Sequence, residues 1–278
     1  MKKNPKAKRG AGRILVPLIL AVCCLGFGVS AWKYFSILRA DRQAETVYRE
    51  LRTAVQVQPA PEPAAQSAPA EETPEQPAEE TAAESRTFSV DMNGLREQYP
   101  DLAAWLWLWA GETDIDYPVM QAADNDYYLT HLYDGTYNHN GSIFIDYRNT
   151  GVLTDGNTVL YGHNMQNGGM FNPLNQYKSP EFYSAHPVMK LCTPEGDCTV
   201  ELICGTVEDG NYEFVQLNFV DFNDMNDYVN RFSPRSTFES GVQLQPGDRL
   251  VSFCTCSYEN MNARYMLIGR VAGTPEPD

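Results

Sequence analysis

The feature that most restricts the fold of this chain is an uncharged apolar run from Ile14 to Trp32. A helix over these roughly 19 residues would be about 29 Å long, which matches the hydrocarbon core of a bilayer. The preceding residues 1–13 are basic and contain no acidic residue. Because positive flanks stay in the cytoplasm, we expect residues 1–13 to be a cytoplasmic tail and residues 14–32 to be a single membrane helix. Everything after Lys33 is then extracellular.

A cleaved signal peptide is the alternative interpretation of this run. Its apolar region is usually about 7–15 residues long and ends at a small-x-small cleavage site. Here the run is longer, and Gly28-Val29-Ser30 and Val29-Ser30-Ala31 are weak cleavage candidates. We therefore favour an uncleaved membrane anchor.

Two segments of different composition follow the apolar run. Residues 33–57 are rich in Ala, Arg, Glu and Leu and predict a juxtamembrane helix. Residues 58–85 are dominated by Pro, Ala and Glu and lack aromatic residues, so they cannot bury enough apolar surface to fold. We expect them to form an extended acidic linker. Much of the formal net charge of -15 lies in this linker, so the charge says little about a substrate.

Residues 86–273 carry the pattern of a folded, mainly β domain. Short apolar runs at 141–148, 158–162 and 248–256 predict strands, and residues 221–233 form the best amphipathic helix of the domain. Many short strands with one intervening helix indicate a β-barrel or sandwich. Trp105, Trp107 and Trp109 alternate along a further predicted strand. We interpret them as core packing rather than as a ligand platform.

Composition excludes several classes of function. The acidic balance argues against a nucleic-acid partner, because such proteins usually carry a basic face. With four His, seven Cys and no CxxC pair, we expect no metal site. No glycine-rich phosphate loop is present. Cys192 and Cys198 flank a predicted hairpin turn, and whether they pair stays open.

Three residues at predicted strand ends suit thiol-based acyl transfer. Cys256 ends one strand, Arg264 begins the next, and His163 follows another apolar strand. A cysteine nucleophile needs a nearby cation or base, and an arginine can hold a developing oxyanion. The alternatives are that Cys256 is a small buried apolar residue and that Arg264 forms a surface ion pair with Glu259. Spacing alone rejects neither.

Four ordered stretches resemble the class B sortases. They are IDYPVMQAADNDYYL (115–129), GSIFIDYRN (141–149), LYGHNMQNGGMF (160–171) and TCSYENMNARYMLIGR (255–270). The family signature before the cysteine is Thr-Leu-x-Thr-Cys, and here Ser252 and Phe253 replace its first two residues while Thr255-Cys256 is kept.

The resemblance implies a fold and a set of site residues. It implies an eight-stranded β-barrel with a helix-containing insertion between the sixth and seventh strands, where residues 221–233 belong. It makes His163 the general acid and base, Cys256 the nucleophile, and Arg264 the stabiliser of the oxyanion or substrate. Thr255, Ser257 and Tyr258 are the expected substrate-binding residues. Class B sortases need no metal or organic cofactor.

The resemblance also implies an activity. Sortases are cysteine transpeptidases of Gram-positive bacteria that cleave a C-terminal sorting motif of surface proteins through a thioacyl intermediate. An amine of the cell-wall peptidoglycan precursor then resolves this intermediate. The alternatives are a pilus-type sortase, a thiol hydrolase of the same fold and an inactive wall-associated scaffold. We rank the pilus-type enzyme lower because no second apolar span follows the domain. Cys254 and Cys256 could be oxidised to each other, but we favour simple packing of Cys254.

Overall fold

The computed structural model describes residues 11–55, 90–108, 114–259 and 261–273. The chain divides into two compact units, Met1–Val47 and Tyr48–Asp278. Five sequence-based predictions fall wholly or partly outside the described residues. They are the basic tail up to residue 10, the end of the juxtamembrane helix at 56–57, the acidic linker at 58–85, the start of the folded domain at 86–89, and Trp109.

The described residues of the first unit form one long helix, whose last turns belong to the second unit. Helix α1 (Ala11–Val55) covers the apolar run and, up to Val55, the predicted juxtamembrane helix without a break. Its large apolar side chains between Ile19 and Ile37 are exposed. From Ile19 onward it is long and apolar enough, by length and composition, to cross a membrane.

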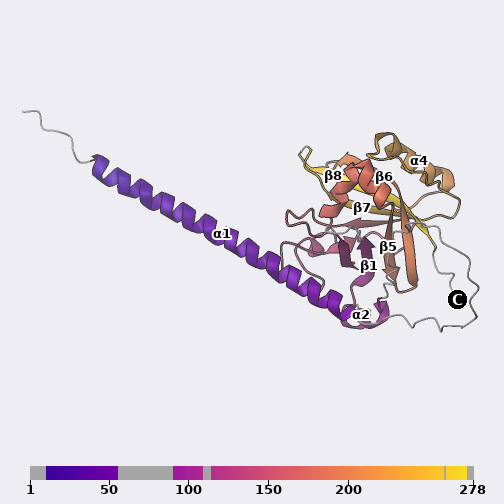
Figure 1. Cartoon of the computed structure of the whole chain (residues 1–278), viewed down its shortest axis with the longest axis horizontal. Coiled ribbons are helices and arrows are strands. Elements are labelled where there is room, and N and C mark those ends of the chain that lie inside the picture. The colour runs from indigo at the N-terminus through magenta and orange to yellow at the C-terminus, as the bar shows by residue number, and fades with distance from the viewer. Residues whose placement is uncertain (1–10, 56–89, 109–113, 260, 274–278) are drawn as a thin grey trace, which may run out of the picture. The chain divides into compact units, whose positions relative to one another are not determined.

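The second unit is built on a closed β-barrel, which confirms the predicted mainly β fold (Figure 1). Within the described residues, eight strands follow one another around the barrel in the order β1-β2-β3-β4-β7-β8-β6-β5. Their bounds are β1 (Leu102–Leu108), β2 (Ile115–Met120), β3 (Ile143–Ile145), β4 (Asn157–Tyr161), β5 (Val188–Thr193), β6 (Gly196–Asp209), β7 (Leu250–Cys256) and β8 (Ala263–Ala272).

Short helices precede the first strand or connect later strands. They are α2 (Met92–Gln98), η1 (Tyr127–Leu129), η2 (Asn172–Lys178), α3 (Pro180–Ala185), α4 (Phe222–Phe232) and η3 (Ser233–Arg235). Helix α4 lies in the connection between β6 and β7, where the resemblance places a helix. It begins at Asp221, whose carboxylate accepts the backbone N–H of Asp224 at 3.0 Å, as an N-cap should.

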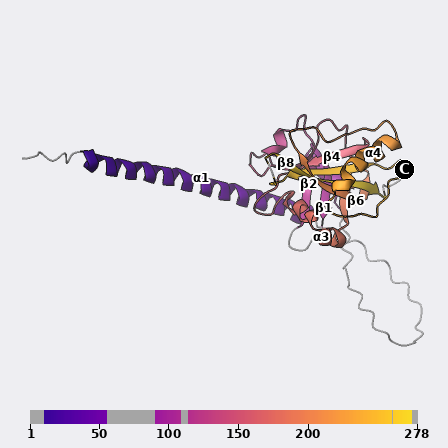
Figure 2. The same ribbon diagram turned by 90° about the horizontal axis from the view of Figure 1, so that it is seen from above.

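Helix α4 covers part of the outer face of the barrel (Figures 1 and 2). Its buried side chains fall at helical spacing: Met225, Tyr228, Val229 and Phe232. They pack with Leu250 and Cys254 of β7 and with residues of β4, β6 and β8. Because side chains alternate along a strand, the even-numbered residues of β7 face outward, and Cys256 continues this face beyond α4.

The strand register shows which way the side chains of Cys192 and Cys198 point. Cys192 lies opposite Asp197, and Cys198 lies opposite Leu191. Since opposite residues share a face and successive residues alternate, Cys192 and Cys198 point to opposite faces of the hairpin. Both are free thiols. Trp105 is fully buried, as expected for core packing, and its indole N–H donates to Asp116 at 2.7 Å.

The last turns of α1 belong to the barrel unit. The Tyr48 hydroxyl donates to the Gly141 carbonyl at 2.9 Å and lies 2.9 Å from the Ser142 hydroxyl. The Arg52 guanidinium donates to the Asp116 carbonyl at 2.8 Å. The compact unit that contains the barrel therefore starts at Tyr48, upstream of residue 86.

Candidate active site

Strand pairing brings the three predicted catalytic residues together. Strands β4 and β7 are parallel neighbours, with Tyr161 beside Cys254, so His163 and Cys256 emerge at the same edge of the barrel. Strand β8 is antiparallel to β7 and places Arg264 directly opposite Cys256. His163, Cys256 and Arg264 line one cavity of about 310 Å³. Its other lining residues are Asn125, Asp126, Leu129, Phe144, Tyr161, Gly162, Cys254 and Thr255.

Hydrogen bonds lock the end of β4 to the end of β7. The Gly162 N–H donates to the Cys254 carbonyl at 3.2 Å, and the Thr255 hydroxyl donates to the Gly162 carbonyl at 2.8 Å. The Asn164 amide donates to the Cys256 carbonyl at 2.9 Å. These bonds fix the backbone on both sides of His163 against the backbone that carries Cys256.

The half-buried His163 ring is oriented by a backbone carbonyl. Its Nε2 lies 2.7 Å from the Leu129 carbonyl oxygen. A carbonyl only accepts, so Nε2 carries a hydrogen and, in the neutral ring, Nδ1 keeps the free lone pair. The contact therefore selects the tautomer in which Nδ1 can take a proton.

Arg264 is half-buried opposite Cys256. Its Nη1 donates to the Ala263 carbonyl at 3.2 Å. A guanidinium has five N–H donors in a fixed fork, so it can also bind an oxyanion. The alternative partner considered for it, Glu259, forms its ion pair with Lys178 at 2.6 Å instead.

Lys178 is a residue of this region that sequence reasoning missed. Its ammonium donates to the Ser257 hydroxyl at 2.7 Å and to Asn175 at 2.8 Å, besides pairing with Glu259. It also lies 5.1 Å from the ring centroid of Tyr265. Burial raises the pKa of Glu259, but hydrogen bonds from Lys178 and Ser257 outweigh it and lower that pKa to about 2. Lys178 thus joins η2, which follows the His163 loop, to the loop that follows Cys256.

The three predicted substrate-binding residues differ in exposure. Thr255 and Ser257 are buried, and their hydroxyls contact Gly162 and Lys178 respectively. Tyr258 is 72% exposed, and its hydroxyl donates to the Asn164 carbonyl at 3.2 Å. Of the three side chains, only that of Tyr258 presents a large surface to solvent.

The two neighbouring cysteines have different environments. Cys254 is buried among the residues under α4, and burial, with a smaller effect of Asp146, raises the pKa of its thiol. Cys256 is only half-buried and lines the cavity. Both are free thiols. The accessible thiol is therefore that of Cys256.

A second cavity of about 350 Å³ adjoins the first. Tyr161, Cys254 and Arg264 line both cavities. The other walls of the second cavity are Arg148 and residues 210–215, which follow β6. Within the described part of the chain, no group of three or more His, Cys, Asp or Glu side chains is placed to hold a metal ion.

Comparisons with known proteins agree with this architecture. No family model matches the chain. Sortase B of Listeria monocytogenes is 34% identical over 169 residues, which are 61% of this chain and 68% of that protein. Sortase B of Staphylococcus aureus is 25% identical over 173 residues, 62% of this chain and 70% of that protein.

Solved structures of sortase B are also similar to this chain. The crystal structure of Clostridium perfringens sortase B is 30% identical and has a TM-score of 0.61. The match covers 65% of this chain and 99% of that one. Since this chain is 34% identical to sortase B of Listeria monocytogenes and covers 68% of that protein, it belongs to the class B sortases, which are sortase-type transpeptidases.

Proposed function

We propose that this protein cleaves a C-terminal sorting motif of surface proteins and joins the new carboxyl end to an amine of the peptidoglycan precursor. The observation that carries the proposal is the placement of Cys256 opposite Arg264 in a cavity shared with His163. A nucleophile, an acid–base and a fork of donors around one cavity are the groups that acyl transfer needs.

The first half of the reaction uses all three groups. His163 takes the thiol proton while the Cys256 sulfur bonds to the scissile carbonyl carbon, and Arg264 binds the resulting oxyanion. When the intermediate collapses, the C–N bond breaks and His163 returns the proton to the leaving amine. The product is a thioester on Cys256.

The second half reverses these roles. The acceptor amine attacks the thioester, His163 takes its proton, and the sulfur leaves to regenerate Cys256. The proton then returns from His163 to the sulfur, so the site is restored. No cofactor enters either half. Of the three predicted substrate contacts, Thr255 lines the cavity and Tyr258 is exposed two residues after Cys256, whereas the buried Ser257 bonds to Lys178 and supports the loop after Cys256.

We also propose that α1 anchors the enzyme in the cell membrane, with its N-terminus in the cytoplasm and the barrel outside. The exposed apolar side chains from Ile19 to Ile37 and the basic residues that precede the helix support this orientation. The barrel would then be on the side of the membrane where surface proteins and wall precursors meet.

The test uses the full chain in detergent, because Tyr48 and Arg52 of α1 contact the barrel. The enzyme is incubated with a library of sorting-motif peptides, with and without amine acceptors, and products are identified by mass spectrometry. We expect a ligated product that disappears in Cys256→Ala, with the variant still folded. Cleavage without ligation to any amine would favour a thiol hydrolase. A folded enzyme with a free Cys256 thiol and no thioacyl adduct would favour an inactive scaffold.

A further inference from the structure

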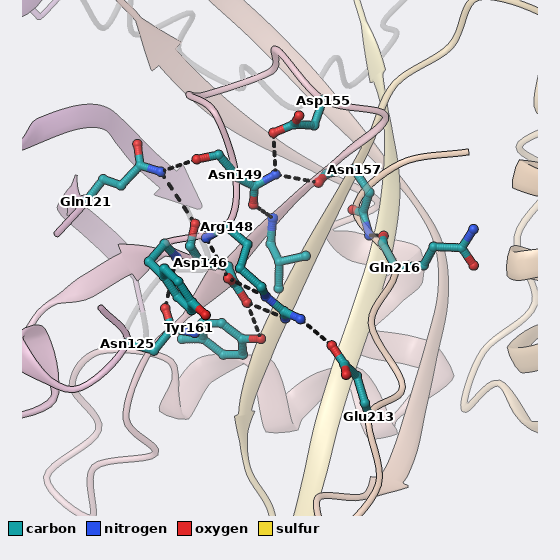
Figure 3. A network of polar contacts seen from close by, with 12 residues as sticks. Gln121, Asn125, Asp146, Arg148, Asn149, Asp155, Asn157, Tyr161, Glu213 and Gln216 are labelled. Carbon is teal, nitrogen blue, oxygen red and sulfur yellow. Dashed lines mark hydrogen bonds and ion pairs between the residues drawn. The ribbon is translucent and has the colours of Figure 1, made fainter. Parts of the chain in front are cut away.

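The fully buried carboxylate of Asp146 binds two residues that line the cavities, Arg148 and Tyr161 (Figure 3). Its oxygens accept hydrogen bonds from the Arg148 guanidinium at 2.9 and 2.8 Å, from the Arg148 backbone N–H at 3.0 Å and from the Tyr161 hydroxyl at 3.0 Å. Because a buried charge needs such partners, this network holds the Arg148 side chain in one orientation.

Arg148 extends from this network to the surface. Its Nη1 donates to the carboxylate of Glu213, on the opposite side from Asp146 (Figure 3). The side chain of Glu213 is 65% exposed, whereas that of Asp146 is fully buried. Arg148 is therefore a bridge between the rigid barrel and a surface residue of the β6–β7 connection.

Glu213 lies in the segment that walls the second cavity. Residues 210–215 line this cavity together with Arg148, Tyr161 and Arg264. The segment is anchored at its start, where the Gly210 N–H donates to the Asn262 carbonyl at 2.9 Å. It is anchored again further on, where the Asn157 amide donates to the Gln216 carbonyl at 2.8 Å. The ion pair of Glu213 with Arg148 adds a third attachment, or tether, between the two hydrogen bonds at Gly210 and Gln216.

Tyr161 connects the same network to the catalytic cavity. Its side chain lines both cavities, and its hydroxyl is fixed by Asp146. It is two residues before His163 and is the register partner of Cys254, two residues before the nucleophile. One buried carboxylate thus holds the Tyr161 ring between the cavities and, through Arg148, the outer wall of the second one.

We propose that Glu213 and Arg148 are positioning residues that hold residues 210–215 as a wall, and so set how tightly the enzyme binds the part of the peptide that extends past Arg264. The proposal rests on the proposed function for its substrate. Whether the ion pair holds residues 210–215 in place can be tested without any substrate.

The first experiment measures hydrogen–deuterium exchange of the full chain in detergent. Glu213→Gln keeps the size of the side chain and removes its charge. We expect the amides of residues 211–215 to exchange about two- to five-fold faster, the range for loss of an exposed ion pair. Glu213→Lys, which places a like charge beside Arg148, should give a larger increase. Unchanged exchange in both variants would overturn the proposal.

The matched control is Glu201→Gln. Glu201 binds Arg270 at 2.8 Å, at the end of β8 remote from Arg264, so the variant also removes one partly exposed ion pair. It should leave exchange of residues 211–215 unchanged. An equal increase in this control would mean that the effect is general loosening, and the tether would be rejected.

The second experiment separates binding from chemistry, using the peptide that the library assay selects. Glu213→Gln should raise KM about two- to five-fold and leave kcat within about two-fold, because the wall contacts substrate and not the reacting atoms. A fall in kcat at unchanged KM would overturn the positioning role. If the unmodified enzyme cleaves no peptide, the proposed function fails, while the exchange experiment still decides whether the tether exists.

Discussion

Cys256 and Arg264 are direct partners across the antiparallel pair of β7 and β8, so the thiol and the guanidinium project from the same face of the barrel. Opposite residues in such a pair have Cβ atoms about 4.5–5.5 Å apart. An oxyanion formed on a carbonyl that Cys256 attacks would therefore lie within reach of the Arg264 donors. The register itself, rather than a mobile loop, sets this geometry.

The first prediction concerns the N–H donors of the Arg264 guanidinium. Arg264→Ala should lower kcat/KM for peptide cleavage by about 10²- to 10³-fold, the loss typical of removing an oxyanion donor. The kcat/KM of Arg264→Lys should lie between those of wild type and Arg264→Ala, because lysine keeps the charge and loses the planar guanidinium. Steady-state kinetics of both variants test this. Arg270→Lys on the same strand is the control and should remain active, whereas full activity of Arg264→Ala would refute the assigned role.

The second prediction concerns the accessibility of the thiols. In the native full chain, iodoacetamide should label Cys256 and spare Cys192, Cys198, Cys204 and Cys254, which are buried. Burial raises the pKa of the Cys198 thiol to about 11 and that of Cys204 to about 12. At pH 8 a thiol of pKa about 11 is only about one-thousandth thiolate.

Peptide mass spectrometry after timed labelling gives the measurement, and labelling in urea is the control in which all five of these barrel thiols should react. Labelling of Cys256 should be the same with and without prior reduction, because Cys254 and Cys256 are both free. A native Cys254 that reacts as fast as Cys256 would contradict the burial of its side chain.

Much of the site could be predicted because its residues sit at the ends of strands with strong local signals. Strands β4, β7 and β8 are short apolar runs, and the motifs around His163, Cys256 and Arg264 are contiguous in the sequence. The burial of Thr255 also follows from a local rule. Side chains alternate along β7, so Thr255, next to the outward-facing Cys256, faces inward.

The supporting contacts could not be predicted, because they join residues far apart in the chain. Lys178 reaches Ser257 across 79 positions, and Arg148 reaches Glu213 across 65. Tyr48 meets Gly141 across 93 positions, from a helix that the sequence assigns to the membrane side of the linker. No periodicity or motif marks these partners, since only the closure of the barrel brings them together.

The third prediction follows from the ion pair between Lys178 and Glu259. Lys178→Met should let the pKa of Glu259 rise from about 2 towards its ordinary value near 4.5. A carboxyl whose pKa is lowered by folding stabilises the native state above its unfolded pKa, and this contribution is lost as the pH falls through the folded pKa. The stability difference between wild type and variant should therefore be constant above about pH 5 and shrink between about pH 4.5 and 2.

Urea unfolding at several pH values measures this difference. Because the Glu259 side chain is 42% exposed, solvent screening keeps the expected effect below about 1 kcal/mol. The variant should also lose about tenfold in kcat, since the loop after Cys256 is no longer held against η2. Lys178→Arg, which keeps the charge, is the control and should retain most activity. A stability difference between wild type and Lys178→Met that grows towards low pH would contradict the lowered pKa of Glu259.

The fourth prediction concerns the backbone that orients His163. Gly141 has φ +58, and a Cβ added there would lie 2.4 Å from the Tyr128 carbonyl oxygen and 2.8 Å from that of Leu129. The Leu129 oxygen is the partner of His163 Nε2. Gly141→Ala should therefore destabilise the fold by about 2 kcal/mol or more and lower kcat, because the clash displaces the carbonyl that fixes the imidazole tautomer.

Gly247→Ala separates this clash from backbone strain alone. Gly247 also has a positive φ, +95, but a Cβ there would meet nothing within 4 Å. It should cost about 1 kcal/mol, the usual penalty for a side chain in that conformation, and leave kcat unchanged. Chemical unfolding and peptide kinetics of the two variants make the comparison. If Gly141→Ala matched Gly247→Ala in both stability and kcat, the Leu129 carbonyl would have no part in holding His163.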